Sequence, residues 1–78
     1  MGDEAASDRA VVETASDAAE GLILSRYSQS EIRDVDVTVR FEDGVLEVDV
    51  YLDAPGDAEQ VAEDAALAAQ AAVDDLLG

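Results

Sequence analysis

The chain has 78 residues, of which twenty are acidic and four basic, and its formal net charge is -16 at pH 7. All four cations are arginines, and lysine, histidine and cysteine are absent. These absences exclude a histidine base, a thiol nucleophile, a Schiff-base lysine, cysteine-ligated zinc and disulfide bonds. The length predicts one small domain over residues 1–78, with no room for a second core.

The acidic excess predicts a protein built for concentrated salt. A net charge this far from zero destabilises a compact chain by self-repulsion unless ions screen it. At molar salt the Debye length shrinks to about 3 Å, so neighbouring surface carboxylates no longer repel one another strongly. An acidic disordered tail is the alternative, but 49% hydrophobic residues in periodic order favour a folded domain. We expect the fold to weaken sharply below about 0.5 M salt, and an unchanged cooperative melting temperature in dilute buffer would contradict this.

The first predicted element is an amphipathic helix over residues 3–27. Its weak point is Gly21, where the helix could end and residues 22–27 continue as a strand. We favour one continuous helix because Leu22 and Ile23 extend the apolar stripe that precedes them. The stripe consists of Val11, Ala15, Ala18 and Leu22, widened by Val12, Ala19 and Ile23.

The period then changes from helical spacing to strict alternation of apolar and polar residues. Two strands are predicted, over residues 33–41 and 45–53, each with one apolar face. Asp43 and Gly44 lie between them, a pair typical of the two-residue hairpin turn, in which both central residues have positive φ. The sequence therefore predicts an antiparallel hairpin.

The register of this hairpin follows from the apolar pattern. A two-residue loop, or a four-residue variant with the same pairing, sets Val39 opposite Val48, whereas a three-residue loop would set Val39 opposite Glu47 and split the apolar face. The favoured register also sets Arg40 opposite Glu47, where we predict a cross-strand ion pair.

A second helix is predicted over residues 57–77. Asp57 and Gln60 have the spacing of a capping box at its start. Small residues dominate the predicted buried stripe, which consists of Ala58, Val61, Ala65, Ala68, Ala72 and Leu76, flanked by Ala62, Ala69 and Val73. The element order helix, strand, strand, helix predicts an α+β fold with two layers, in which both helices pack on one face of the hairpin.

The two predicted layers differ in width. Two helices side by side span roughly 20 Å, whereas two strands span about 10 Å. A third strand over residues 22–27 would partly close this gap. A homodimer that joins two hairpins edge to edge into four strands is the other arrangement that the sequence suggests.

Acidic residues cluster at the open end of the hairpin. The register sets Asp34 opposite Asp53, with Asp36 on the same face. Three carboxylates in this position are a candidate site for Mg²⁺ or Ca²⁺. The competing interpretation is that they belong to the hydrated acidic surface. We predict no catalytic residue and no cofactor.

Four large apolar residues fall outside the predicted core. Leu24 and Tyr27 lie at or beyond the edge of the first stripe, Leu67 lies off the second, and Tyr51 lies on the polar face of the hairpin. These residues are candidates for a contact surface with a protein partner. Incidental exposure is the competing interpretation, because scattered apolar surface residues are common.

Other features restrict location and partners. Asp3 and Glu4 stand where an export signal would carry basic residues, and Gln70 interrupts the longest apolar stretch, residues 65–73. We therefore predict a cytoplasmic protein without a membrane span. The absence of a basic patch and of a glycine-rich phosphate loop argues against a nucleic-acid partner.

The runs Glu31–Val37 and Leu46–Leu52, followed by an alanine-rich acidic helix, resemble a small family of uncharacterised archaeal proteins. The resemblance covers nearly the whole chain and implies no catalytic residue. Genes of that family often lie beside those for the prefoldin beta subunit and for a small subunit of the tRNA-modifying KEOPS complex, which implies an accessory role in such assemblies. Our principal prediction is a non-enzymatic, self-associating interaction domain. A carboxylate-based metal-binding domain and an RNA-associated accessory domain are the alternatives.

Overall fold

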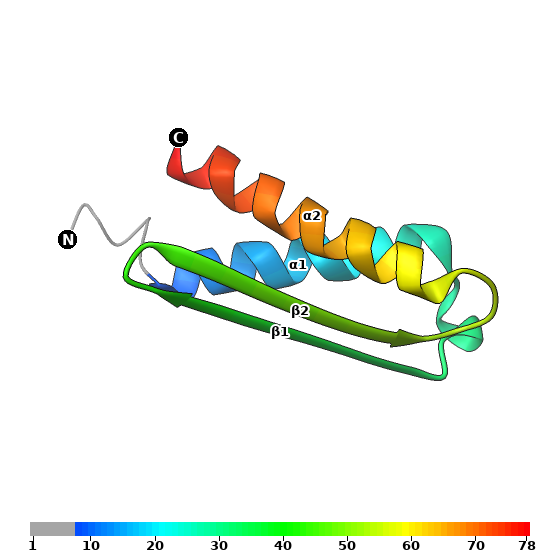
Figure 1. Cartoon of the computed structure of the whole chain (residues 1–78). Helices are drawn as coiled ribbons and strands as arrows, with labels where there is room; N and C mark the ends of the chain where they lie inside the picture. The colour runs from blue at the N-terminus through cyan, green and yellow to red at the C-terminus, as the bar shows by residue number, and fades with distance from the viewer. Residues whose placement is uncertain (1–7) are drawn as a thin grey trace.

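A computed structural model describes residues 8–78. The elements in chain order are α1 (Asp8–Arg26), a 3₁₀ turn η2 (Gln29–Glu31), β1 (Asp34–Glu42), β2 (Val45–Asp53) and α2 (Ala58–Leu77). Both helices lie on one face of the antiparallel hairpin (Figure 1), with α1 against β1, α2 against β2 and the two helices in contact. The predicted α+β fold is therefore confirmed. The predicted start of the first helix, at residue 3, lies outside the described residues.

Helix α1 continues through Gly21 to Arg26 without a break. The amide of Tyr27 donates to the carbonyl of Ile23 at 3.0 Å, which closes the last turn. Residues 22–26 are thus helical, and the sheet of residues 8–78 has two strands only. The prediction of one continuous helix is confirmed. The helix continues past Gly21 because the side chain of Ile23, which is 2% exposed, anchors the last turn in the core.

The hairpin has the predicted register, with Val39 opposite Val48 and Arg40 opposite Glu47. Asp43 has a φ of 53° and Gly44 a φ of 77°, as the two-residue turn requires. The predicted ion pair is wrong, however, because no ion pair joins Arg40 to Glu47 among the described residues. The structure instead pairs Arg26 with Asp64 at 3.3 Å, and so links the two helices.

Helix α2 begins without the predicted capping box. Asp57 is the N-cap residue, but its side chain makes no capping hydrogen bond. Its φ of -93° and ψ of 64° depart from the extended backbone that directs an N-cap side chain toward the helix amides. The side chain of Gln60 donates to Asp64 Oδ1 at 3.1 Å instead.

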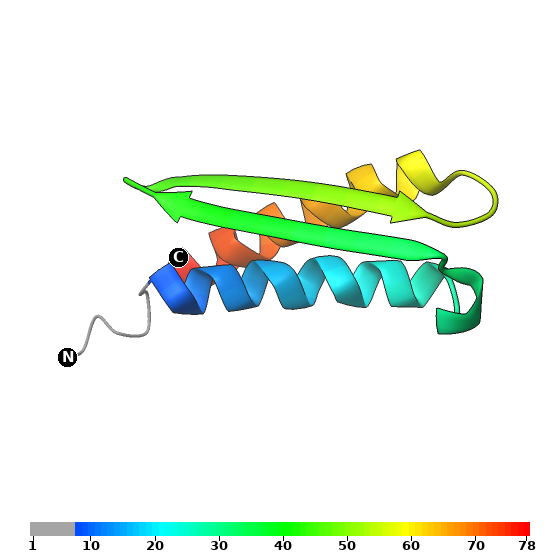
Figure 2. The same ribbon diagram turned by 90° about the horizontal axis from the view of Figure 1, so that it is seen from below.

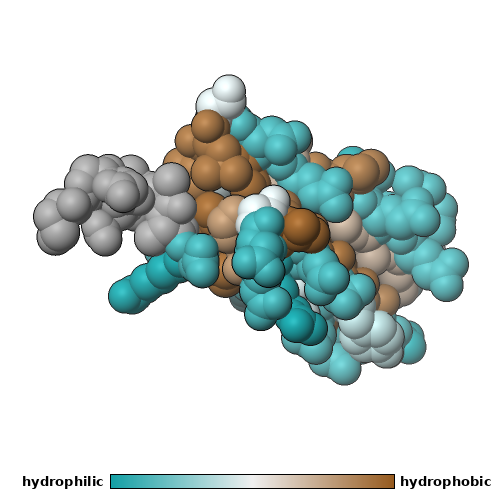
Figure 3. Space-filling model, turned by 60° about the vertical axis from the view of Figure 1, so that its left-hand side comes forward, coloured by the Kyte–Doolittle hydropathy of each residue, from teal (hydrophilic) through white to brown (hydrophobic). Residues whose placement is uncertain are grey.

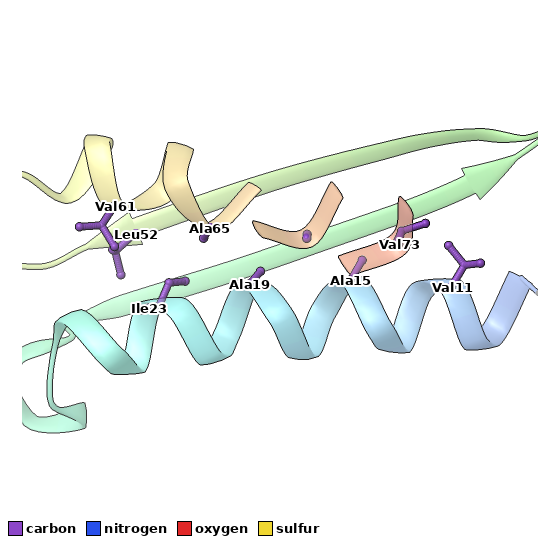
Figure 4. Packing of buried hydrophobic residues seen from close by; sticks show 9 residues of the cluster. Val11, Ala15, Ala19, Ile23, Leu52, Val61, Ala65 and Val73 are labelled. Atoms are coloured by element: carbon purple, nitrogen blue, oxygen red, sulfur yellow. The ribbon is translucent and has the colours of Figure 1, made fainter. Parts of the chain in front are cut away.

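The core is a seam between the two helices, closed by the inner face of the hairpin. The buried helical residues recur at every fourth position: Val11, Ala15, Ala19 and Ile23 on α1, and Val61, Ala65, Ala69 and Val73 on α2. Figure 4 shows Val11 beside Val73 at one end of the seam, and Ile23 toward Val61 and Leu52 at the other. Rows of residues four apart are the ridges by which packed helices interdigitate.

The predicted stripes coincide with this seam only in part. The stripe on α1 shares Val11 and Ala15 with it and the stripe on α2 shares Val61 and Ala65, and both then leave it, while the seam continues through residues that were predicted to flank the stripes. Ala18 and Leu22 on α1, and Ala68 and Ala72 on α2, are half-buried, while Leu76 is 40% exposed. The physical reason is that each helix has two neighbours, the other helix and the sheet. The most buried line on each helix points between these two neighbours, so a stripe drawn for a single facing layer follows it for only part of its length.

Candidate functional site

One open feature of the described residues is a groove of about 530 Å³ between the C-terminal half of α1 and the beginning of β1. Its apolar lining consists of Ile23 and Leu24 from α1, Ile32 from the connection, and Val35 and Val37 from β1. Glu20 and Asp36 add one carboxylate from each side. We call this feature the α1–β1 groove.

The connection between α1 and β1 holds the groove open. The η2 turn is inserted between the two elements, and α1 and β1 diverge toward it (Figure 1). The turn is fixed by hydrogen bonds, because the amide of Ser28 donates to Glu31 Oε1 at 2.9 Å and the amide of Glu31 donates to the carbonyl of Ser28 at 3.0 Å. Ile32, which follows the turn, is half-buried against the core. The groove is therefore held open by an ordered connection.

Two walls of the groove carry apolar side chains that the domain does not cover. Leu24 on α1 is 49% exposed, and Val35 on β1 is 42% exposed. Strand β1 has β2 as its neighbour on one side only, which leaves its other edge unpaired in the described sheet. Figure 2 shows α1 running alongside this open edge of β1. Unpaired backbone groups and uncovered apolar side chains thus occur together.

A second groove lies along the other side of the hairpin, between β2 and α2. Its helical wall consists of Ala62 and Ala66, with Glu59 and Glu63 beside them. Leu52, on the strand side, is only 8% exposed. Val50, Tyr51 and Leu52 form its strand side, and its volume is about 620 Å³. It differs from the α1–β1 groove in its helical wall, which carries only small apolar side chains.

The four residues predicted to form an interface do not line one groove. Leu24 lies in the α1–β1 groove, Tyr51 borders the groove on the β2 side, and Leu67 is 62% exposed on α2. Tyr27 has a role inside the fold, since its hydroxyl donates to the carbonyl of Pro55 at 2.6 Å. Their role as an interface stays a prediction.

The sequence pattern did not single out Val35 as a surface residue. Val35 belongs to the apolar positions of the alternating run over residues 33–41, and this alternation predicts that it faces the core. Its exposure arises from its place at the start of the strand, where the layers separate. The only signal in the sequence that could have indicated the exposure of Val35 was the difference in width between the layer of helices and the layer of strands.

The acidic candidates Asp34 and Asp53 face each other across the hairpin as predicted, and Asp36 lies opposite Tyr51. Within residues 8–78, no three acidic side chains are grouped as a metal ion would require. A metal site at these aspartates stays a prediction. Titration with Mg²⁺ or Ca²⁺ at constant ionic strength tests it, since a site would give saturable shifts at all three residues.

Hydrophilic residues cover much of the remaining surface. Figure 3 looks toward the end that holds the hairpin turn, and shows apolar surface near the C-terminus among hydrophilic residues. Leu77, at the end of α2, is 49% exposed. Neither helix in the described part of the chain has the length and apolar character needed to cross a bilayer.

Comparison with known proteins places the chain in a family. Residues 7–76 match the model of a family described as a protein of unknown function, DUF3194, and the chain belongs to that family. It is 63% identical over 76 residues to an uncharacterised protein of the halophilic archaeon Natronomonas pharaonis, an alignment that covers 95% of this chain and 90% of the relative. No solved structure matches the chain. The resemblance found in the sequence is confirmed, and it brings no assigned activity.

Proposed function

We propose that this chain is a non-enzymatic protein-interaction domain, and that its binding surface is the α1–β1 groove. The observation that carries the proposal is the exposure of Leu24 and Val35 on two walls of one groove, beside an unpaired strand edge. An open strand edge and an uncovered apolar surface are both features through which proteins bind other proteins.

The charges at the groove favour a protein partner over a nucleic acid. The charged side chains that line it are the carboxylates of Glu20 and Asp36. Neither side chain can neutralise a phosphate, and nucleic-acid binding depends on basic side chains that do so. Apolar side chains of a protein, in contrast, match the lining of the groove.

Concentrated salt favours binding through the apolar walls of the groove over binding through charged side chains. Molar salt screens ion pairs at the surface, but burial of apolar surface still removes it from water and stabilises a complex. In a domain with a net charge of -16, apolar contacts are therefore the interactions least weakened under the conditions that its composition predicts. Leu24 and Val35 supply such contacts.

An affinity capture in molar KCl tests the proposed surface. The variant Leu24→Ser removes one wall of the groove, and Leu67→Ser is the matched control, because both leucines are exposed on helices. We expect a set of proteins that the wild type and Leu67→Ser retain and Leu24→Ser loses, while circular dichroism shows all three folded. Retention of the same proteins by Leu24→Ser would contradict the proposal.

A further inference from the structure

The two layers of the domain have different widths, and the difference appears at the β1 edge. Two packed helices are about 20 Å wide, and two strands are about 10 Å wide. Because α1 runs alongside the open edge of β1 (Figure 2), part of its sheet-facing surface has no strand above it. Leu24 belongs to this uncovered strip and lines the groove together with Val35.

A second copy of the chain does not remove this difference in width. Joining two hairpins edge to edge, as the sequence suggested, doubles the helices as well as the strands, so the ratio of the two widths is unchanged. The α1 helix of each copy would also have to occupy the strip beside the shared edge. A strand that brings no helix of its own, in contrast, widens only the sheet.

We propose that the α1–β1 groove binds a single extended segment of a partner protein, which adds a third strand beside β1. This inference rests on the proposed function of the same groove and names the class of partner. Addition of a strand to an open sheet edge gives affinity through main-chain hydrogen bonds, and pockets for alternate side chains give specificity. Here the pocket lies between Leu24 and Val35, and it takes one large apolar side chain of the segment.

The charges beside the groove define the other side chains of the segment. Successive residues of a strand point to opposite faces, so a segment with apolar residues toward the groove turns every second side chain toward the outer face of the sheet. On that face β1 presents Asp34 and Asp36, and Glu20 lies on the helical side of the groove. Opposite charges on neighbouring strands stabilise their pairing. Molar salt weakens this effect without abolishing it for partly buried pairs, so the charges set a preference and the apolar contacts supply most of the affinity. The segment therefore alternates apolar and basic residues.

The β2 edge is a weaker candidate for the same partner. Leu52 is already buried there, at 8% exposed, so a new strand would cover little more of it, although Tyr51 on the same strand is 56% exposed. The opposing helical wall is Ala62 and Ala66, which leave a large apolar side chain little to contact. Val35, at 42% exposed, has more surface to lose on the β1 side.

The test uses a synthetic peptide in which arginine and isoleucine alternate over six residues, with both ends blocked. Its control has the same composition, with the three arginines and three isoleucines in separate blocks. Binding is followed by NMR on the full chain in molar KCl. We expect saturable shifts at the methyl groups of Leu24, Val35 and Val37 with the alternating peptide, and much weaker shifts with the block peptide.

Variants establish where the peptide binds. Leu24→Ser should weaken binding by about tenfold or more, the effect of removing a buried leucine contact. Leu67→Ser should leave binding unchanged. Val35→Thr, which keeps the shape of the side chain, provides a second test should Leu24→Ser fold poorly, and we expect it to weaken binding as well.

Two outcomes would overturn the inference. Equal binding of both peptides, or binding that neither Leu24→Ser nor Val35→Thr weakens, would show that no strand is added at this edge. A Leu24-dependent dimer in sedimentation equilibrium without peptide would show that a second copy occupies the groove. In the second case the proposed function would stand, whereas capture of the same proteins by Leu24→Ser would overturn the proposed function itself.

Discussion

Helix α1 meets its two neighbours in different ways. Toward α2 it presents Ala15 and Ala19, both 0% exposed, in a seam where small side chains let the helices approach closely. Toward the beginning of β1 it presents Leu24, which is 49% exposed in an open groove. One helix thus forms a closed contact with small residues and an open contact with large ones. The closed contact holds the fold, and the open contact leaves apolar surface for a partner.

Two adjacent residues of α1 give the largest expected difference in the free energy of unfolding. Ile23 is 2% exposed, and Ile23→Ala should lower the free energy of unfolding by about 2 to 5 kcal/mol through the lost burial and the cavity that remains. Leu24→Ala should change it by about 0.5 kcal/mol or less, as exposed substitutions do. Chemical denaturation in molar KCl measures both. Equal losses would mean that Leu24 is covered and the groove is closed in solution.

The alanine seam should not tolerate larger side chains. Ala65→Leu inserts a branched side chain between the helices, and we expect a loss of about 1 to 3 kcal/mol in the free energy of unfolding. Ala71→Leu, on the exposed side of the same helix, serves as the control and should be nearly neutral. If both variants unfold at the same denaturant concentration, the two helices do not pack closely at Ala65.

The two tyrosines have different roles, because Tyr27 stabilises the fold and Tyr51 lies on the surface. Tyr27→Phe removes the hydroxyl that donates to Pro55, and should lower the free energy of unfolding by about 0.5 to 1.5 kcal/mol. Tyr51, 56% exposed, has no such bond among the described contacts, so Tyr51→Phe should have no measurable effect. Thermal unfolding of both variants at one salt concentration makes the comparison. An effect of equal size at Tyr51 would contradict the assigned roles.

The smallest expected effect lies on the solvent side of α1. Apart from its chain neighbours and the backbone of its own helix, no atom lies within 4 Å of a Cβ placed on Gly21. Gly21→Ala should therefore raise the free energy of unfolding by about 0.5 to 1 kcal/mol. Gly44→Ala should have the opposite sign, because Gly44 has a φ of 77° in the hairpin turn. A destabilised Gly21→Ala variant would show that α1 is broken at that residue in solution.

The regular elements were predictable because their signals are local and repeat. Val39 and Val48 belong to alternating runs, and the Asp43-Gly44 turn fixes how those runs pair. The start of α2 was not predictable in detail, since Asp57 has a suitable residue type but an unsuitable backbone conformation. A residue pattern identifies candidate caps, but the preceding loop decides whether the side chain reaches the amides.

The α1–β1 groove could not be predicted from the sequence, for a different reason. Leu24 was predicted to be exposed from its position off the helical stripe, but nothing in the pattern linked it to Val35, eleven residues later. Their proximity depends on the η2 turn and on the angle at which the hairpin leaves α1. Exposed apolar residues can thus be found singly in the sequence, whereas their grouping needs the tertiary structure.

The central claim is that the domain alone leaves the α1–β1 groove open while the helix seam is closed. NMR relaxation of methyl groups with a neutral, soluble paramagnetic chelate in molar KCl tests this directly. We predict strong enhancement at Leu24 and Val35, and little at Val11 and Val73, which lie in the seam. If the methyl groups of Leu24 and Val35 show as little enhancement as those of Val11 and Val73, the account is contradicted.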